Sequence, residues 1–316
     1  MIPRIARRLG ILVASLFASS VLVFAFMAIL PGDPARVALG VNASDESVAQ
    51  LRTQFGLDRS SATQYLDWIG GFLTSNLGQS YVSRADIGPQ LADRLQVTLW
   101  LVVTSMVLAA LIAVPLGAVS ALRHRRPSGL VLSALSQVGV AVPAFLAGLL
   151  LITVFAVQLG WLPANGWTPP ANDPAMFVKQ LLLPALSLGI VQGAVLTRYV
   201  RSAILDVQRE DYLRTARSKG LSPTVALRRH GLRNAAVPVV TVLGLQLATL
   251  LVGAVVVERV FVIPGLGSLL LDAVAQRDLK IVQDVVMVLV VAVLVVNFVV
   301  DLLYVAIDPR LRAGAR

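Results

Sequence analysis

The chain has 316 residues, of which 57% are hydrophobic and only 14% are charged, and its mean hydropathy is +0.79. A soluble domain of this length needs far less apolar material to fill its core, so the composition predicts a membrane protein. The chain has no cysteine, which excludes disulfides, thiolate metal ligands and cysteine nucleophiles.

Six charge-poor intervals are long enough to cross a membrane: residues 9–30, 94–123, 126 to about 160, 179–198, 233–258 and 284–308, the last interrupted only by Asp301. A helix needs about 20 mostly apolar residues to cross roughly 30 Å of hydrocarbon. Runs of this length exclude the strands of a membrane β-barrel. The fold class predicted is therefore all-α, a polytopic bundle of six transmembrane helices, in which Pro115, Pro143, Pro184 and Pro238 are expected to kink their helices.

The first interval follows Arg4, Arg7 and Arg8, a pattern that a signal peptide would share. Its apolar run is about 22 residues, longer than the apolar region of a typical signal peptide, and it ends in "PGDPAR" without a clear A-x-A cleavage site. We therefore expect residues 1–30 to form a retained N-terminal segment and first transmembrane helix.

The charges of the connecting loops predict the orientation, because loops rich in Lys and Arg stay in the cytoplasm. With six spans, one side carries 18 Lys and Arg against 4 acids, and the other side carries 9 against 12. Both termini are thus predicted to be cytoplasmic. The net charge of +10 follows from this bias, so no nucleic-acid partner is expected.

The spans divide the rest of the chain into two regions. Residues 31–96 are expected to be an extracytoplasmic loop with short amphipathic helices, and residues 97–316 a core of five transmembrane helices. That core includes a cytoplasmic loop at 206–237 and an outer loop at 258–284.

Motifs of catalysis and cofactor binding are missing from the sequence. There is no G-x-x-x-x-G-K-[ST] phosphate-binding loop, and the two histidines, His124 and His230, have no metal-ligand spacing. No Ser, His and acid constellation stands out either. The sequence therefore predicts a protein that is not an enzyme and binds no metal, ATP or other cofactor itself.

The segment 211–238, "DYLRTARSKGLSPTVALRRHGLRNAAVP", is strongly basic. Residues 206–219 lack helix breakers and carry acids early and bases late, which predicts a helix. Gly220 can take a positive φ at its end, and Ser222 and Pro223 predict the N-cap and first residue of a second short helix. Any long cytoplasmic loop is expected to be basic. The Gly and Ser-Pro, however, specify a shaped elbow that suits docking to a partner protein.

This elbow resembles the "EAA" loop of ABC importer permeases, whose pattern is E-A-A, three residues, Gly, nine residues and I-x-L-P. Gly220 takes the place of the family Gly, and Thr215 and Ala216 fall on the two Ala positions. Two departures matter: Arg214 stands in the place of Glu and His230 in the place of Ile. This variant is similar to that of the oligopeptide, dipeptide and nickel branch.

Other motifs of that branch occur in the same order along the chain. They are "LPGDP" at 30–34, "FGLD" and "QYLDWIGGFLTSNLGQS" in the outer loop, "ERVFVIPGLGSLLLDAVAQRD" at 258–278 and "DPRLR" near the end. The resemblance covers nearly the whole chain and points to the B-type permease subunit of that branch.

The resemblance implies a type I ABC importer permease fold in the bacterial inner membrane. The implied partners are a second homologous permease in a heterodimer, two ATPase subunits that hold ATP and Mg, an extracytoplasmic solute-binding protein and membrane lipid. The implied cargo is di- or oligopeptide, with nickel chelates, glutathione or haem as alternatives. A more remote alternative is an ion-coupled secondary transporter, for which Asp301 is the one clear ionisable residue inside a span.

The resemblance also assigns a coupling contact with the ATPase: Arg214, Thr215, Ala216, Arg217, Ser218, Lys219, Gly220 and Leu221, with His230 nearby. Polar residues within spans are candidates for the translocation path: Gln137, Gln192, Thr241, Gln246, Thr249 and Asn297. Hydrogen bonds between helices would explain each of them equally well.

The outer segments have open alternatives as well. Glu258, Pro264, Gly265 and Gly267 are expected at the outer mouth of the path by resemblance, with a plain surface loop as the alternative. In the loop 31–96, one amphipathic piece has Val48, Leu51 and Phe55, and an aromatic piece has Tyr65, Trp68 and Phe72. Both pieces either dock the binding protein or lie on the bilayer.

Overall fold

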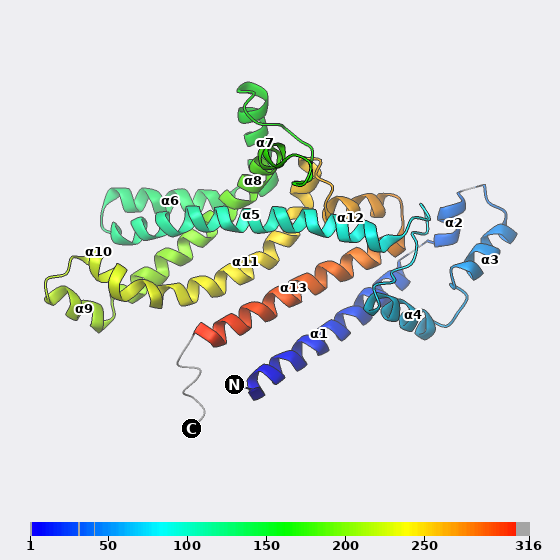
Figure 1. Ribbon diagram of the computed structural model, residues 1–316, viewed down its shortest axis with the longest axis horizontal. Helices are drawn as coiled ribbons and strands as arrows, with labels where there is room; N and C mark the ends of the chain where they lie inside the picture. Colours follow the sequence, from blue (N-terminus) through cyan, green and yellow to red (C-terminus); the bar gives the residue numbers. More distant parts are fainter. Residues whose placement is uncertain (1, 31, 41, 308–316) are drawn as a thin grey trace. The chain divides into compact units, whose positions relative to one another are not determined.

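A computed structural model describes residues 2–30, 32–40 and 42–307, and its regular secondary structure is almost entirely helical (Figure 1). The "DPRLR" motif, with Asp308, lies outside these residues. The helices are α1 (Ile2–Ile29), α2 (Pro34–Leu39), α3 (Asp45–Gln54), α4 (Ser61–Leu73), α5 (Ile87–Leu122), α6 (Pro127–Ala141), α7 (Ala144–Leu151), the π-helix η1 (Ile152–Gln158), α8 (Pro174–Gln208), α9 (Asp211–Ser218), α10 (Pro223–Ala226), the π-helix η2 (Leu227–Gly231), α11 (Leu232–Val260), α12 (Leu266–Ala275) and α13 (Leu279–Ile307).

The chain forms two compact units. Among the described residues, the first unit comprises 99–263 and 296–307, and the second comprises 2–98 and 264–295. Helices α5 and α13 contribute residues to both units.

Five helical runs in the described part of the chain are long and apolar enough to span a membrane, namely α1, α5, α8, α13 and the unbroken run from α10 to α11. The third of the six expected spans differs from the prediction, because α6 and the following α7–η1 helix meet at an angle of 100°. Pro143 restricts the residue before it, and Val142 has the extended backbone that ends α6. Residues 127–158 therefore form two shorter helices in place of one straight span, which fits either a broken span or a re-entrant loop. The expected end near Gly160 is confirmed, since η1 stops at Gln158.

In the first unit, α8 packs against α6, α7 and α11. Its contact with α5 is close because glycines face the partner helix. A Cβ atom on Gly117 of α5 would lie 2.7 Å from the Cβ of Val200, and one on Gly189 of α8 would lie 3.0 Å from the Cβ of Leu108. Small residues that let helix backbones approach are typical of membrane helix pairs. The two helices are therefore held together along much of their length.

In the second unit, the aromatic side of α4 lies against α1 and α13. The Tyr65 hydroxyl hydrogen-bonds Ser20 Oγ of α1 at 2.9 Å, and the Trp68 indole Nε1 donates to Asp284 Oδ1 of α13 at 2.7 Å. Phe24 packs edge-on to Tyr65, with ring centroids 5.5 Å apart. Helices α1 and α13 of the same chain thus cover the aromatic side of α4. This corrects the expectation that the aromatic side faces the bilayer or a binding protein.

The amphipathic side of α3 is covered in the same way. Val48 and Leu51 are buried together with Ala35 of α2, and the ring of Phe55 lies 4.3 Å from that of Tyr81. Asp33 caps α2 by accepting from the Ala35 backbone N–H at 3.0 Å, and it pairs with Arg52 of α3 at 2.9 Å. Helices α2 and α3 therefore form a small packed element.

Two helices extend beyond the boundaries expected for the spans. The core helix expected to start at 97 begins at Ile87, because helical backbone continues through the charged residues Asp93 and Arg94. The outer loop expected at 258–284 contains α12, and α13 begins within it at Leu279. The expected spans end at charged residues such as Arg94 and Asp284, but a helix often continues beyond the hydrocarbon.

We predict that the Trp68→Phe substitution lowers the stability of the protein by about 1–3 kcal/mol, because it leaves the buried Asp284 carboxylate without its indole donor. The measurement is the temperature at which the purified, detergent-solubilised protein loses its monodisperse peak in size-exclusion chromatography. Trp161→Phe is the control, since Trp161 is 67% exposed. Equal melting temperatures of the two variants would show that the indole–carboxylate bond contributes nothing.

Candidate functional site

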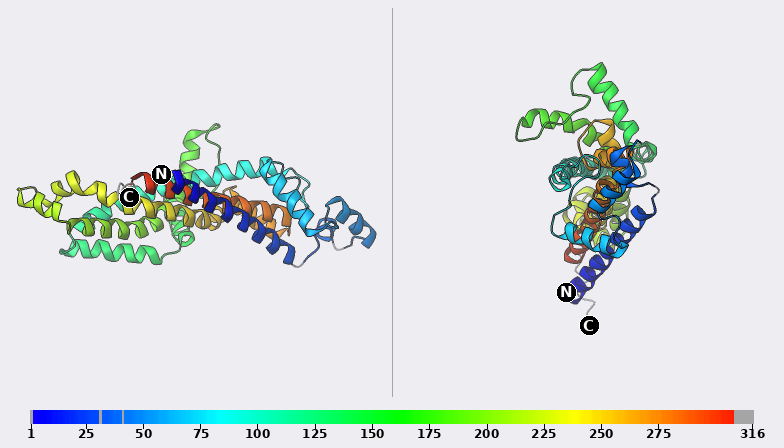
Figure 2. Two further views of the ribbon diagram at one scale, coloured as in Figure 1. Left: turned by 90° about the horizontal axis from the view of Figure 1, so that it is seen from below. Right: turned by 90° about the vertical axis from the view of Figure 1, so that its right-hand side faces the viewer.

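The elbow, residues 206–237, joins the ends of α8 and α11 in the first unit, where α9 and α10 lie (Figures 1 and 2). The single helix expected over residues 206–219 is wrong. Helix α8 ends at Gln208, and α9 begins at Asp211 after Glu210 takes an extended backbone, with φ −65° and ψ 140°. The elbow therefore starts with a sharp change of direction that its composition did not reveal.

The turn of the elbow has the predicted construction. Gly220 has a φ of +91°, and its N–H donates to the Arg217 carbonyl at 3.0 Å. Ser222 is the N-cap of the second helix, with its Oγ accepting from the Val225 N–H at 3.4 Å, and Pro223 is that helix's first residue. The second helix is longer than expected, because α10, η2 and α11 follow one another without a break.

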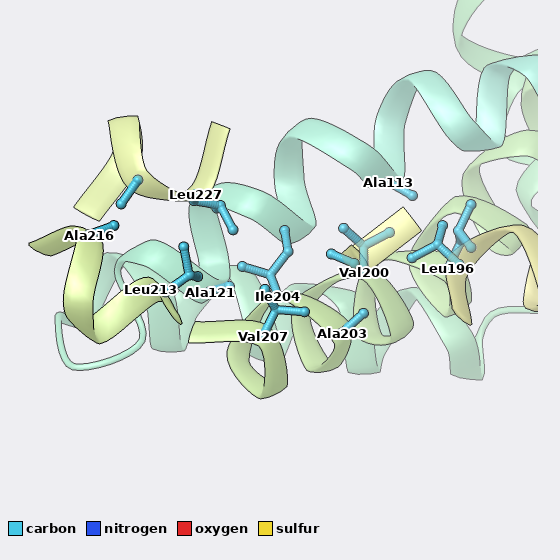
Figure 3. Packing of buried hydrophobic residues seen from close by; sticks show 13 residues of the cluster. Ala113, Ala121, Leu196, Val200, Ala203, Ile204, Val207, Leu213, Ala216 and Leu227 are labelled. Carbon is cyan, nitrogen blue, oxygen red and sulfur yellow. The ribbon is translucent and has the colours of Figure 1, made fainter. Parts of the chain in front are cut away.

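A buried apolar cluster fixes the elbow to the long helices (Figure 3). Leu213 and Ala216 of α9 meet Leu227 of η2 and Val207 of α8 in this cluster. At Gly231, a Cβ would lie 2.8 Å from Leu227 Cδ1 and 3.1 Å from Val207 Cγ1, so a larger residue there would force these side chains to shift. The elbow is consequently a packed element and not a flexible loop.

Polar side chains add two ties within the elbow. The Arg217 guanidinium donates from Nη2 to the Gln208 carbonyl at 2.7 Å and from Nε to the Leu213 carbonyl at 3.2 Å. Carbonyls in the last turn of a helix lack intrahelical partners, so Arg217 satisfies one at the end of α8. Asn234 Nδ2 donates to the Tyr212 hydroxyl at 2.8 Å. The hydrogen bond between Tyr212 and Asn234 was not predicted, because sequence patterns carry no signal for a contact between separate helices.

The nine expected coupling residues divide into two groups. Ala216 is buried, Leu221 packs against the apolar cluster, and Arg217 is half-buried, so these three are part of the elbow's internal structure. The other six are exposed: Arg214, Thr215, Ser218, Lys219, Gly220 and His230. Three further exposed bases lie on the second helix and were not among the expected residues: Arg228, Arg229 and Arg233.

The six candidate path residues lie on helices of the first unit. Gln137 of α6 lines a hollow of about 280 Å³ that Arg198, Arg201 and Ser202 of α8 also line. Gln192 is half-buried on α8. The hollow is polar, but it does not include the other candidates.

The remaining path candidates have different surroundings. The Thr241 and Thr249 hydroxyls donate to carbonyls of their own helix at 3.2 and 3.4 Å, so their polar groups are satisfied locally. In Gln246 the buried Nε2, and in Asn297 the buried Oδ1, have no hydrogen-bond partner among the described residues. Buried polar groups of this kind need a partner, so both side chains remain candidates for the path.

The outer-mouth residues are not a surface loop. Glu258, Gly265 and Gly267 are buried, and Pro264 is partly buried. Residues 261–265 are non-helical as expected, but Gly267 lies within α12. The alternative of a plain surface loop is therefore wrong.

The second unit contains buried ionisable residues that the sequence did not single out. Asp278 accepts hydrogen bonds from Ser80 Oγ and from the Ile281 N–H, which caps the start of α13. Burial, and then the charges of Asp284 and Asp278, raise the pKa of Tyr81 to about 12, so its phenol stays neutral at physiological pH. Within the described residues, no group of three or more His, Cys, Asp or Glu could hold a metal ion.

Comparison with protein families identifies the class of this chain. A family model described as the inner membrane component of binding-protein-dependent transport systems matches residues 113–313, and the model of the N-terminal region of such components matches residues 1–102. The chain belongs to this family. It is a multi-pass permease subunit of an ABC importer of the bacterial inner membrane and not an enzyme, so the ion-coupled secondary transporter is ruled out.

Curated relatives support the same class. The permease is 42% identical to the glutathione transport system permease protein GsiC of Escherichia coli (strain K12), with 99% of each chain covered. The protein of that name from Salmonella typhimurium is also 42% identical over 99% of both chains. Sequence similarity thus extends over both units of the permease.

Two solved structures show that the fold is that of type I ABC importer permeases. One is an inward-facing form of the MetNI methionine ABC transporter, with a TM-score of 0.58 and 19% identity over 69% of this permease and 96% of that chain. The other is an amino acid ABC transporter with histidines, with a TM-score of 0.51 and 22% identity over 68% and 93%.

We predict different effects for two arginines of α9. Arg217→Gln loosens the elbow by removing the bond to the Gln208 carbonyl, and it lowers stability by about 1–2 kcal/mol. Arg214→Gln changes stability by less than about 0.5 kcal/mol, because its pair with Asp211 is exposed and 3.4 Å long. Limited proteolysis of inverted membrane vesicles measures the effect as the cleavage rate within the elbow. Equal cleavage rates for the two variants would contradict a stabilising role for the hydrogen bond from Arg217 to the Gln208 carbonyl.

Proposed function

We propose that this permease forms, with a second homologous permease, the path by which short peptides enter the cell, and that its elbow docks on an ATPase subunit. The observation that carries the docking role is the packed elbow. Leu213 and Ala216 anchor α9 from within, while Arg214, Thr215 and Ser218 are exposed on it. A rigid element can transmit movement between two states, whereas a mobile loop cannot.

The charge of the elbow supports both the docking role and the orientation. Lys219, Arg228, Arg229 and Arg233 are exposed on it. Such bases favour the cytoplasmic side for the elbow, where ATPase subunits with ATP and Mg would bind, and both termini would share that side. The extracytoplasmic side would then carry α2, α3, α4 and α12, and a solute-binding protein would deliver the cargo there.

The proposed cargo is di- or oligopeptide, with glutathione included as a modified tripeptide. Two observations support it: the elbow variant of the peptide branch, and relatives at 42% identity that are named for glutathione transport. Nickel chelates and haem are less well supported, since neither occurs in the names of these relatives. The half-buried or buried amides of Gln192, Gln246 and Asn297 suit a path for polar peptide groups.

Cysteine cross-linking tests the docking role directly, because the chain has no cysteine of its own. We predict that Ser218→Cys, exposed on α9, forms a cross-link with the co-expressed ATPase when a short bifunctional maleimide is added to membranes. Ser61→Cys is the control, since Ser61 is also exposed but lies at the start of α4. A cross-linked band from Ser61→Cys only, or from neither variant, would refute docking through the elbow.

Uptake measurements test the cargo. The complete importer is expressed in a bacterial host that lacks its own peptide and glutathione importers, and uptake of labelled glutathione and of labelled dialanine is followed with and without the permease. We predict permease-dependent uptake of at least one of these, reduced more than tenfold when the paired ATPase is inactivated. Uptake of nickel chelate or haem alone would contradict the peptide assignment while leaving the importer class intact.

A further inference from the structure

An apolar groove of about 500 Å³ lies within the second unit, between the region that follows α1 and the ends of α12 and α13. Its lining includes the apolar side chains of Leu30, Val37, Val274, Leu279 and Val282, together with Arg277. The volume is in the range of small-molecule binding pockets. We call this hollow the span-end groove.

The span-end groove lies at the ends of two candidate membrane spans, where hydrocarbon gives way to headgroups. Leu30 directly follows the span Ile5–Ile29, and Leu279 is the first residue of the span Leu279–Leu302. Both residues line the groove, so one end of each span is found there. Apolar surface at this depth meets the upper part of lipid acyl chains, and basic side chains meet phosphates.

Arg277 occupies a backbone position that favours glycine. Its φ is +56°, its N–H donates to the Val274 carbonyl at 3.1 Å, and the next N–H, of Asp278, donates to the Ala273 carbonyl at 2.9 Å. These two bonds form the Schellman motif that ends α12, in which this position is usually Gly. A side chain with a Cβ atom is strained in this conformation. Strain of this kind points to a role for the side chain.

The Arg277 guanidinium is available to bind an anion. It is exposed, and no hydrogen bond or ion pair joins it to any residue that the structure describes. The neighbouring charges are already paired: Arg52 with Asp33 at 2.9 Å, and Lys280 with Asp284 at 3.5 Å. Asp278 is buried and accepts from Ser80 Oγ and a backbone N–H. Arg277 is therefore the free cation at the groove among the described residues.

A second, more polar hollow of about 270 Å³ adjoins the groove. The two share Leu30 and Leu279 in their linings, and the second also includes Gln64 and Tyr81. An apolar hollow that continues into a polar one matches a molecule with an alkyl chain on one side and a polar headgroup on the other.

We propose that the span-end groove binds an anionic phospholipid, with an acyl chain among Val37, Val274 and Val282 and the phosphate on Arg277. The glycerol and the remaining headgroup would extend toward the adjoining polar hollow. Such a lipid covers apolar surface where the chain leaves the first span and enters the last. The proposal is independent of the cargo and of docking through the elbow.

Native mass spectrometry of the full-length permease, purified in complex with its partners and delipidated in detergent, tests the proposal. Dioleoyl phosphatidylglycerol and dioleoyl phosphatidylcholine are titrated separately. We expect Arg277→Gly to bind phosphatidylglycerol about tenfold more weakly than the unmodified permease, because a charge-assisted hydrogen bond is lost. Glycine suits the positive φ, so this variant should fold at least as well.

Arg84→Gly is the matched control. Arg84 is also exposed with a positive φ of 61°, and it lies over the Phe55 ring and outside the groove lining. We expect it to bind both lipids as the unmodified permease does. Val274→Trp, which fills the groove, should weaken binding of both lipids, and inorganic phosphate at the same concentration should not displace the lipid. Equal affinity of Arg277→Gly and the unmodified permease for phosphatidylglycerol would overturn the proposal, as would displacement by phosphate alone.

Discussion

Close packing of α5 against α8 is the constraint on which the first unit depends. At Gly117 a Cβ atom would collide with Val200 of the partner helix, and at Gly189 it would be in tight contact with Leu108. In a membrane there is little hydrophobic gain from bringing helices together, so van der Waals contact between closely fitting surfaces has to hold them. The same two helices continue to the apolar cluster that includes Ala121 and Ile204, on which the elbow rests.

The elbow shows how similar residues acquire different tasks through folding. Arg214 and Arg217 are three positions apart on α9, and in the sequence both are simply members of a basic segment. One turn of helix separates a side chain facing solvent from one that reaches the end of α8. The same basic composition therefore contains a base that faces solvent and a base that determines the shape of the segment.

Local chemistry made part of this structure predictable. Gly220, Ser222 and Pro223 were correctly assigned because caps and turns depend on a few neighbouring residues. The positions of five spans were predictable for the same reason, since hydropathy is a local property. The bend at Pro143 was underestimated, because a proline either kinks a helix or ends it, and tertiary packing decides between the two. The partners of Trp68 and Arg217 could not be found, because Asp284 lies more than 200 positions from Trp68 along the chain, and the Gln208 carbonyl becomes available only where α8 stops.

The two arms of the elbow are attached to the bundle in different ways. Between α8 and α9 the helix is interrupted at Arg209 and Glu210, whereas residues 223–260 form one continuous helical run of 38 residues. At 1.5 Å per residue this run is about 57 Å long. A displacement of Pro223 would therefore pass into α11 through continuous helix, whereas a displacement of α9 would reach α8 through a non-helical joint and the side-chain contacts across it, namely the Arg217–Gln208 bond and the apolar cluster. The two arms of the elbow thus differ in whether helical backbone or side-chain packing connects them to the long helices.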